Sequence, residues 1–154
     1  MDVRAASVSD IPQLLALVRR YWEFEQIAPF DALRVELTLK RLLSEQHLGA
    51  AWVAEHGGQL HGYLIAVLVL SLEHHGLMAE IDEFFVLAEA RARGVGTRLL
   101  AAAETALAAR GCVRLQLQLG AGNDAGRAFY GRRGYAARDG YRLFDKALRA
   151  ERSP

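Results

Sequence analysis

EIDEFFVLAEARARGVGTRLL, residues 80–100, is the stretch on which the fold prediction depends. It predicts an apolar strand over residues 81–87, then the turn Arg-Ala-Arg-Gly-Val-Gly, and then an alanine- and leucine-rich helix over residues 97–110. An anion at such a turn meets unpaired amides of the first helical turn, the positive end of the helix dipole and two flanking guanidinium groups. We interpret the turn as a pyrophosphate site formed by Arg91, Ala92, Arg93, Gly94, Val95, Gly96 and Thr97.

The two glycines of this turn bear on what it can bind. Gly94 and Gly96 let phosphate oxygens approach the backbone, and glycine tolerates the unusual dihedral angles of a tight turn. The turn lacks the third glycine of a dinucleotide-binding loop and the Gly-Lys-Ser/Thr of a P-loop, so the pattern indicates another phosphate-bearing ligand. Taken alone, it is equally compatible with an ordinary strand-to-helix turn that carries a solvated arginine.

Two motifs together resemble a known family. Residues 80–100 are similar to the acetyl-CoA-binding motif of the GNAT superfamily of N-acetyltransferases, a strand followed by Arg/Gln-x-x-Gly-x-Gly/Ala and a helix. Residues 123–135, NDAGRAFYGRRGY, resemble the family's second motif and lie at its usual separation from the first. Within the superfamily, the segments DEFFV (82–86), FYGRRG (129–134) and GYRLF (140–144) are most similar to the diamine (spermidine/spermine) N-acetyltransferase branch. The resemblance implies acetyl-CoA as co-substrate and direct transfer of its acetyl group to an amine.

The resemblance also implies roles for individual residues. Asp82 is the favoured acceptor of the amine proton, with Glu83 and Glu80 behind it, and Tyr130 is the general acid that protonates the leaving thiolate. Strand alternation is expected to place Glu80 and Asp82 on one face of the sheet and Glu83 on the other. Besides the turn, the expected coenzyme contacts are the backbone at Phe84, Phe85 and Val86 and the residues Asn123, Gly126, Tyr130 and Arg132. The expected substrate contacts are Tyr21, Glu23, Glu80 and Asp82.

The remaining segments predict a mixed α/β fold around one twisted, mostly antiparallel sheet, in the order β-α-α-β-β-β-α-β-α-β-β, which is also the GNAT architecture. The expected strands are 3–6, 50–55, 59–70, 79–87, 112–119, 135–137 and 141–146, and the expected helices are 9–25, 31–44, 97–110 and 124–133. Gly57-Gly58 and Asp139-Gly140 are hairpin turns in this scheme, and residues 71–78 are a loop. The resemblance adds that the strands at 80–87 and 112–119 splay apart beyond a bulge, with acetyl-CoA between them.

Length and composition indicate a single domain, residues 1–154. No signal peptide or membrane-spanning run is present, and a single cysteine, Cys112, excludes an internal disulfide, so we expect a cytoplasmic protein. The adjacent His74 and His75 have no cysteine or carboxylate at metal-ligand spacing, and we therefore expect no metal.

The net charge of +1 conceals two halves of opposite sign. Residues 1–90 contain 6 basic and 13 acidic residues (−7), whereas residues 91–154 contain 13 and 5 (+8). Coenzyme phosphates account for the basic half, and a cationic, polyamine-like or amino-acid-like primary amine suits the acidic half, with at least one positive charge beyond the reacting amine. The dispersed arginines do not favour nucleic acid.

Several alternatives remain open at this stage. The same scaffold also acetylates aminoglycosides and protein N-termini. A non-catalytic acyl-CoA-binding module would keep the pocket and lack turnover. We expect no membrane partner, and a homodimer by analogy with the family.

Overall fold

The computed structural model describes residues 1–149 of the chain. It contains two compact units, Met1–Gln118 and Leu119–Pro154, and the described part of the second ends at residue 149. The units are described separately below. The prediction of a single domain therefore stays a prediction.

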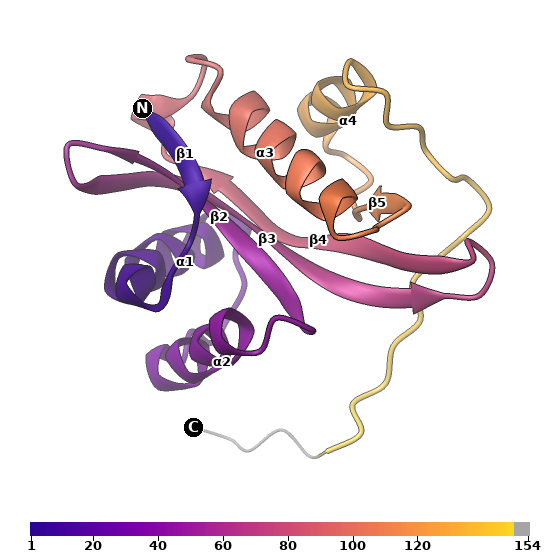
Figure 1. Ribbon diagram of the computed structural model, residues 1–154, viewed down its shortest axis with the longest axis horizontal. Coiled ribbons are helices and arrows are strands. Elements are labelled where there is room, and N and C mark those ends of the chain that lie inside the picture. The colour runs from indigo at the N-terminus through magenta and orange to yellow at the C-terminus, as the bar shows by residue number, and fades with distance from the viewer. Residues whose placement is uncertain (150–154) are drawn as a thin grey trace. The chain divides into compact units, whose positions relative to one another are not determined.

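The first unit is built on a five-stranded sheet with the order β1-β2-β3-β4-β5. Its elements are β1 (Asp2–Ala5), η1 (Val8–Asp10), α1 (Ile11–Glu25), α2 (Ala32–Ser44), β2 (Gly49–His56), β3 (Gln59–Ser71), β4 (Gly76–Val86), η2 (Ala88–Ala90), α3 (Val95–Ala109) and β5 (Arg114–Gln116). The first four strands pair antiparallel, and β5 pairs parallel with β4. Helices α1 and α2 cover one face of this sheet, and α3 covers the other (Figure 1). The predicted mixed α/β, mostly antiparallel class is confirmed.

Apolar stripes on the helices explain this layering. The buried side of α1 carries Leu14 and Val18, which pack in one core with Tyr63 and Ile65 of β3. Asp31 is the N-cap of α2, and its side chain accepts a hydrogen bond from the Arg34 amide (3.1 Å). The apolar spacing of α1 and the capping residue of α2 therefore agree with the tertiary packing.

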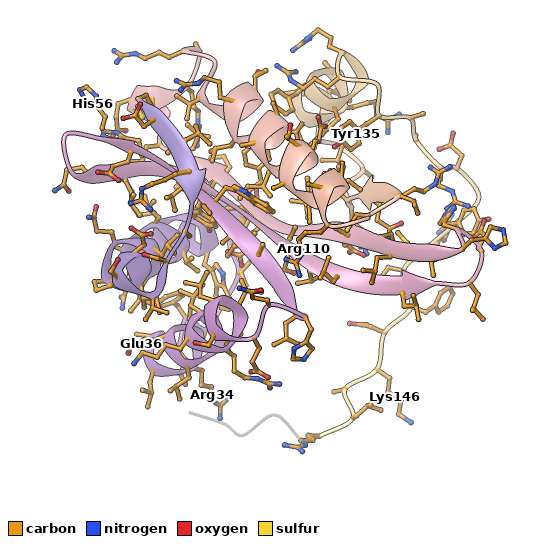
Figure 2. The ribbon with its side chains drawn as sticks, viewed as in Figure 1. Arg34, Glu36, His56, Arg110, Tyr135 and Lys146 are labelled. Carbon is orange, nitrogen blue, oxygen red and sulfur yellow. The ribbon has the colours of Figure 1, made fainter. Side chains whose placement is uncertain are left out.

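The end of α3 is fastened to the beginning of β2. The Arg110 guanidinium, at the close of α3, donates hydrogen bonds to the main-chain oxygens of Gln46 and Gly49 (Figure 2). On the sheet side, α3 buries Leu99, Ala103 and the other apolar residues of one stripe. The helix that starts at the predicted anion-binding turn is thus attached to the sheet by hydrogen bonds at its end and by buried apolar side chains along its length.

A β-bulge interrupts β4 at Asp82. Ile65 of β3 lies opposite Glu83, and the next residue, Ala66, lies opposite Ile81. Asp82 is therefore an extra residue without a partner on β3, which is the pattern of a bulge.

This bulge overturns the expected placement of Glu83. Glu80 lies opposite Val67 and Glu83 lies opposite Ile65, and these two β3 residues are on the same face because they are two positions apart. Asp82 and Glu83 also line one cavity. The three carboxylates therefore share the face covered by α1 and α2, and the prediction that Glu83 faces the other way is wrong, since the inserted residue shifts the alternation by one.

The β3–β4 hairpin is longer than the sequence suggested. Pairing continues to Ser71 opposite Gly76, so that residues 76–78, predicted as part of a loop, belong to β4. Strand β5 is shorter than the predicted 112–119, because its pairing with β4 stops after Glu80 and Gln116. The expected splaying of the two strands, with acetyl-CoA between them, stays a prediction.

The second unit contains α4 (Asp124–Gly131), and its described residues form no strand. The predicted closing hairpin at 135–137 and 141–146 is therefore wrong. Gly140 does have the positive φ (91°) of a turn residue, but Leu143 and Phe144 are exposed. A two-stranded hairpin without a third strand or a packed face is marginally stable, so the local turn signal is insufficient.

None of the helices in the described residues is long and apolar enough to cross a membrane.

Candidate active site

Glu83 of β4 is the centre of the candidate site in the first unit. Its Oε2 accepts a 2.9 Å hydrogen bond from Trp22 Nε1 on α1, and its Oε1 accepts a 2.8 Å hydrogen bond from the Tyr63 hydroxyl on β3. Tyr63 is completely buried, so its hydroxyl requires an internal partner. The carboxylate is therefore held by donors from two separate elements.

Burial raises the pKa of the Glu83 carboxyl above its usual value, and the negative charge of Asp82 raises it further. The hydrogen bonds from Trp22 and Tyr63 lower this pKa because they favour the charged form, but they do not outweigh burial. A carboxylate with a raised pKa binds a proton more readily, and its fixed position makes it suitable as a general base.

Asp82 is adjacent to Glu83 but is more exposed, since it occupies the bulge. Surrounding protein raises the pKa of Asp82, and the charge of Glu80 adds to the effect. Glu80 itself accepts hydrogen bonds from the side-chain amides of Gln116 (3.0 Å) and Gln118 (3.4 Å) and does not line the cavity. Of the three predicted carboxylates, the structure therefore brings Asp82 and Glu83 together at the cavity and holds Glu80 toward the β5 side.

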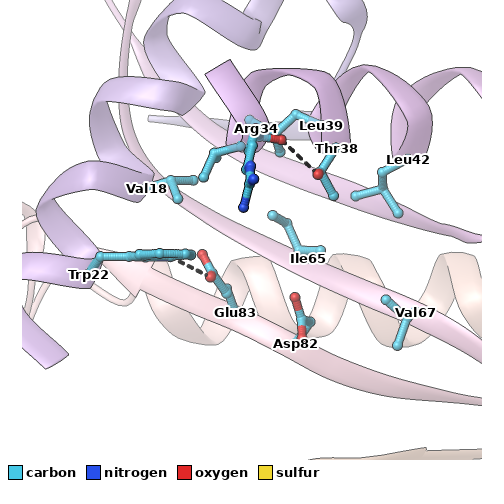
Figure 3. A pocket seen from close by; sticks show the side chains of 11 residues that line it. Val18, Trp22, Arg34, Thr38, Leu39, Leu42, Ile65, Val67, Asp82 and Glu83 are labelled. Carbon is cyan, nitrogen blue, oxygen red and sulfur yellow. Dashed lines mark hydrogen bonds between the residues drawn. The ribbon is translucent and has the colours of Figure 1, made fainter. Parts of the chain in front are cut away.

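A cavity of about 290 Å³ lies against these two carboxylates. Figure 3 shows Glu83 and Asp82 on one side of it, Trp22 and Val18 of α1 beside them, and side chains of α2 opposite. Its lining residues are Val18, Trp22, Arg34, Val35, Thr38, Leu39, Leu42, Ile65, Val67, Asp82 and Glu83. The volume is near the lower end of the usual range for small-molecule pockets, about 300–1,000 Å³.

Aromatic rings form a second group beside Glu83. Tyr21 is half-buried, with its ring 6.4 Å from that of Tyr63 and 5.8 Å from that of Phe85. Burial raises the pKa of the Tyr21 phenol to about 12, and the charges of Glu25, Glu83 and Asp82 contribute. Of the two predicted substrate contacts on α1, Tyr21 thus lies near the carboxylates, whereas Glu23 is exposed and does not line the cavity.

The pairing of β4 with β5 ends at Glu80. Within the part of the chain that the structure describes, no strand pairs with this side of β4 from Ile81 to Val86. The main chain at Phe84–Val86, predicted to contact the coenzyme, lies in this part of the strand. The Arg91 side chain binds the end of β4, because its Nε donates a 2.8 Å hydrogen bond to the Val86 carbonyl.

The predicted anion-binding turn leads directly into the first turn of α3. Gly94 is the N-cap of α3 with φ of 74°, and a methyl group at this position would meet open space. Gly96 is the second residue of the helix, which begins two residues earlier than predicted. The first amides of a helix lack intrahelical partners, and Arg93 beside them is exposed, so the residues fit a phosphate group.

The predicted coenzyme residues of the second unit cluster around α4. Asn123 caps this helix through a 2.9 Å hydrogen bond from the Gly126 amide to Oδ1. Tyr130 is buried, with its ring 5.1 Å from that of Phe129 and 5.4 Å from that of Tyr135. Arg132 follows the helix and is exposed. Their roles toward a ligand stay predictions.

Among the polar and aromatic side chains of the site, Trp22, Arg34, Thr38 and Tyr63 were not predicted from the sequence. Tyr63 carried a usable signal, because a hydroxyl within the apolar run from 63 to 70 must find a partner once that strand is buried. The helical residues carried none, since their contacts depend on how α1 and α2 meet the sheet.

The described residues contain no group of three or more His, Cys, Asp or Glu side chains that could hold a metal ion.

Comparison with known proteins agrees with this architecture. A sequence model of the acetyltransferase (GNAT) family matches residues 11–135. An uncharacterized N-acetyltransferase of Bacillus subtilis, YhfO, is 30% identical over 141 residues, which are 92% of this chain and 93% of that protein.

Solved structures share the fold. An integron cassette protein from the mobile metagenome of Cole Harbour Salt Marsh has a TM-score of 0.84 and 27% identity, with 97% of this chain and 91% of that chain covered. A predicted acetyltransferase of Clostridium acetobutylicum, solved with acetyl-CoA, has a TM-score of 0.80 and 19% identity, with 94% and 95% covered.

Proposed function

The chain belongs to the acetyltransferase (GNAT) family and is an acetyltransferase, and from this premise we propose that it transfers acetyl directly from acetyl-CoA to a primary amine of a small molecule. The Clostridium structure solved with acetyl-CoA supports this donor, and the turn before α3 fits the phosphates. The residues proposed to hold the coenzyme are those of the turn at 91–97, the main chain at 84–86, and Asn123, Gly126 and Arg132.

One observation carries the proposal. The bulge of β4 places Asp82 and Glu83 at a cavity, on a strand that pairs, among the described residues, with no strand on its β5 side from Ile81 to Val86. An amine in the cavity and a thioester along that side of the strand would meet at β4. The carboxylates of Asp82 and Glu83 would then lie next to the amine as it loses its proton.

The chemistry assigned to this pair follows from the charge of amines. An alkyl ammonium has a pKa near that of lysine, about 10.4, and must lose a proton before its nitrogen can attack. We assign proton acceptance to Glu83, directly or through water, with Asp82 beside it attracting the ammonium. The sequence favoured Asp82 as the acceptor, and the two hydrogen bonds that orient Glu83 are the reason for the exchange of roles.

The remaining steps balance around the thioester. The amine nitrogen forms a bond to the carbonyl carbon and loses its second proton to solvent, and the carbon–sulfur bond breaks to give a thiolate and an amide. A thiol has a pKa of roughly 8.5 and a tyrosine phenol one of about 10, so a protonated Tyr130 can supply the proton that the thiolate takes up. This role rests on the family resemblance of residues 123–135. Solvent then returns a proton to the phenolate and removes one from the carboxyl group.

A free-thiol assay tests the proposal. Purified protein with acetyl-CoA should release thiol only when an acceptor amine is added, and a panel of amino acids, polyamines, aminoglycosides and short peptides would identify the class. Glu83→Gln is the control for background hydrolysis. Coenzyme binding by calorimetry without thiol release on any amine would indicate a non-catalytic acyl-CoA-binding module instead.

A further inference from the structure

We propose that the acceptor is a compact amine with an apolar body and a carboxylate, such as a hydrophobic amino acid, and that Arg34 binds its carboxylate. This inference rests on the proposed function, because it assigns the substrate class of the same site. It selects the amino-acid-like acceptor over the polyamine-like one that the charge of the chain also suggested.

The cavity walls are aliphatic. Val18 of α1, Ile65 and Val67 of β3, and a row on α2 (Val35, Leu39 and Leu42) surround the space between the helices and the sheet. A polyamine repeats its ammonium groups along the chain, so a second cation would lie against these walls without a partner. Burial of an unpaired charge is strongly unfavourable, whereas a branched or aromatic side chain would gain from the same contact.

Negative charge is confined to one side of this cavity. Asp82 and Glu83 are the acidic residues that line it, and both come from the β4 bulge. A single ammonium group would be held there, next to the proposed proton acceptor. The cavity therefore offers one cation site rather than a series.

A positive group stands on α2, opposite that acidic side. The Arg34 side chain lines the cavity, and Figure 3 shows its guanidinium extending from α2 toward the floor where Glu83 lies. Among the described residues, the ion pair of this guanidinium is through Nε to Asp31, at 3.4 Å. Its terminal nitrogens can thus form the paired hydrogen bonds with which arginine recognises a carboxylate.

The volume of the cavity also favours an amino-acid ligand. At about 290 Å³, the cavity suits a ligand of amino-acid dimensions and is small for an aminoglycoside. The Arg34 guanidinium extends toward the acidic floor of the cavity (Figure 3), and this arrangement matches a zwitterion in which ammonium and carboxylate are separated by one carbon and the apolar body extends from it.

The test is calorimetric binding to the protein saturated with coenzyme A, using L-leucine, its amide, isoamylamine and 1,4-diaminobutane as probes. We expect L-leucine to bind more tightly than the other three. Arg34→Gln should weaken L-leucine binding about tenfold or more, leave isoamylamine unchanged, and be partly rescued by Arg34→Lys.

Arg41→Gln is the matched control. Arg41 lies on the same helix, its side chain is 69% exposed against 65% for Arg34, and it pairs with Glu45 rather than lining the cavity. This variant should bind all four probes as the wild type does. Equal loss in both variants, an Arg34→Gln variant with unchanged L-leucine affinity, tighter binding of 1,4-diaminobutane, or no binding of L-leucine would each overturn the inference.

The same samples separate this inference from the proposed function. Thiol release with isoamylamine or 1,4-diaminobutane but not L-leucine would leave the acetyltransferase proposal intact and remove the substrate class. Binding of L-leucine that depends on Arg34, without thiol release on any amine, would support the ligand class and overturn the proposed acetyl transfer.

Discussion

The Tyr63 hydroxyl donates a 2.8 Å hydrogen bond to Glu83 Oε1 from the neighbouring strand of the sheet. The two residues are diagonal neighbours, because Glu83 lies opposite Ile65, two positions beyond Tyr63. Burial raises the pKa of the Tyr63 phenol well above its ordinary value, so it remains a donor across the working pH range. The carboxylate is consequently oriented by a group that does not titrate with it.

Tyr63→Phe should shift the acidic limb of the kcat/KM profile to higher pH. The hydroxyl stabilises the charged form of Glu83, and its loss should raise the pKa of that carboxyl further. Trp22→Phe should act in the same direction, because it removes the other donor. The pH profile is the decisive measurement, since a purely structural defect would lower activity at every pH without moving the limb.

Glu83→Gln should lower kcat by about 10² to 10⁴, the usual contribution of a general base. Burial raises the pKa of Glu83, so in the wild type the base is lost as the pH falls through a value above the ordinary glutamate pKa of about 4.3. The variant should lack this limb. Asp82→Asn should mainly raise KM, and a larger kcat loss in Asp82→Asn than in Glu83→Gln would return the role of base to Asp82.

Much of the first unit was predictable because its signals are local. The Gly57-Gly58 turn, the apolar stripe of α1 and the glycine-containing turn before α3 were each readable within a few residues and are found as expected. The bulge at Asp82 could not be predicted, because an inserted residue is defined only by the register of β4 against β3. That register decides which face Glu83 occupies.

The features that could not be predicted depend on long-range contacts or on whether a strand-like segment finds a pairing partner. Trp22 and Glu83 are 61 positions apart, and nothing near either residue indicates their hydrogen bond. Conversely, Asp139-Gly140 is a strong local turn signal between two strand-like segments, yet no strand forms there. A strand requires a partner as well as a propensity, and the sequence could not indicate whether one was available.

Tyr130→Phe should lower kcat by about 10² to 10⁴ while leaving the Kd of coenzyme A nearly unchanged. The proposed reason is that the phenol donates its proton only as the thiolate departs. The substitution removes one oxygen and keeps the ring that lies against Phe129 and Tyr135. Wild-type turnover in this variant would reduce Tyr130 to a packing residue.

Gly94→Ala should weaken coenzyme A binding by about tenfold or more. Gly94 has φ of 74° at the start of α3, where a side chain is strained and its methyl group would occupy the space proposed for phosphate. Gly58→Ala is the matched control, with φ of 76° and equally open surroundings in the β2–β3 turn. Calorimetry should find the affinity reduced only in Gly94→Ala.

Gly96→Val tests the second glycine separately. Gly96 lies inside α3, so backbone strain is not the reason to expect an effect there. A branched side chain would instead hold the phosphate away from the amides of the first turn. A folded variant with unchanged coenzyme affinity would show that the phosphates bind elsewhere.

Arg4→Met should destabilise the protein in a pH-dependent manner, because Arg4 holds a buried carboxylate. Its Nη1 and Nη2 each donate a 2.8 Å hydrogen bond to Asp10, which is 6% exposed, and Nη2 also contacts Glu55 at 2.6 Å. The Arg4 hydrogen bonds lower the pKa of Asp10 below its usual range. A hydrogen bond to a charged group contributes about 1.5–3 kcal/mol, and the 41% exposure of the Arg4 side chain favours the lower end of that range.

The sign follows from the lowered pKa of Asp10. This stabilisation is present above the unfolded-state pKa, about 3.9, and is lost as the pH falls through the lower folded-state value. Urea unfolding should therefore show a loss of about 1.5–2 kcal/mol in Arg4→Met at pH 7, and a difference that shrinks progressively below about pH 4. Arg41→Met, which removes an exposed pair with Glu45, should leave the free energy of unfolding nearly unchanged at either pH. A loss in Arg4→Met that is equally large at pH 7 and at pH 3 would mean that the methylene groups of Arg4, rather than its charge, provide the stabilisation.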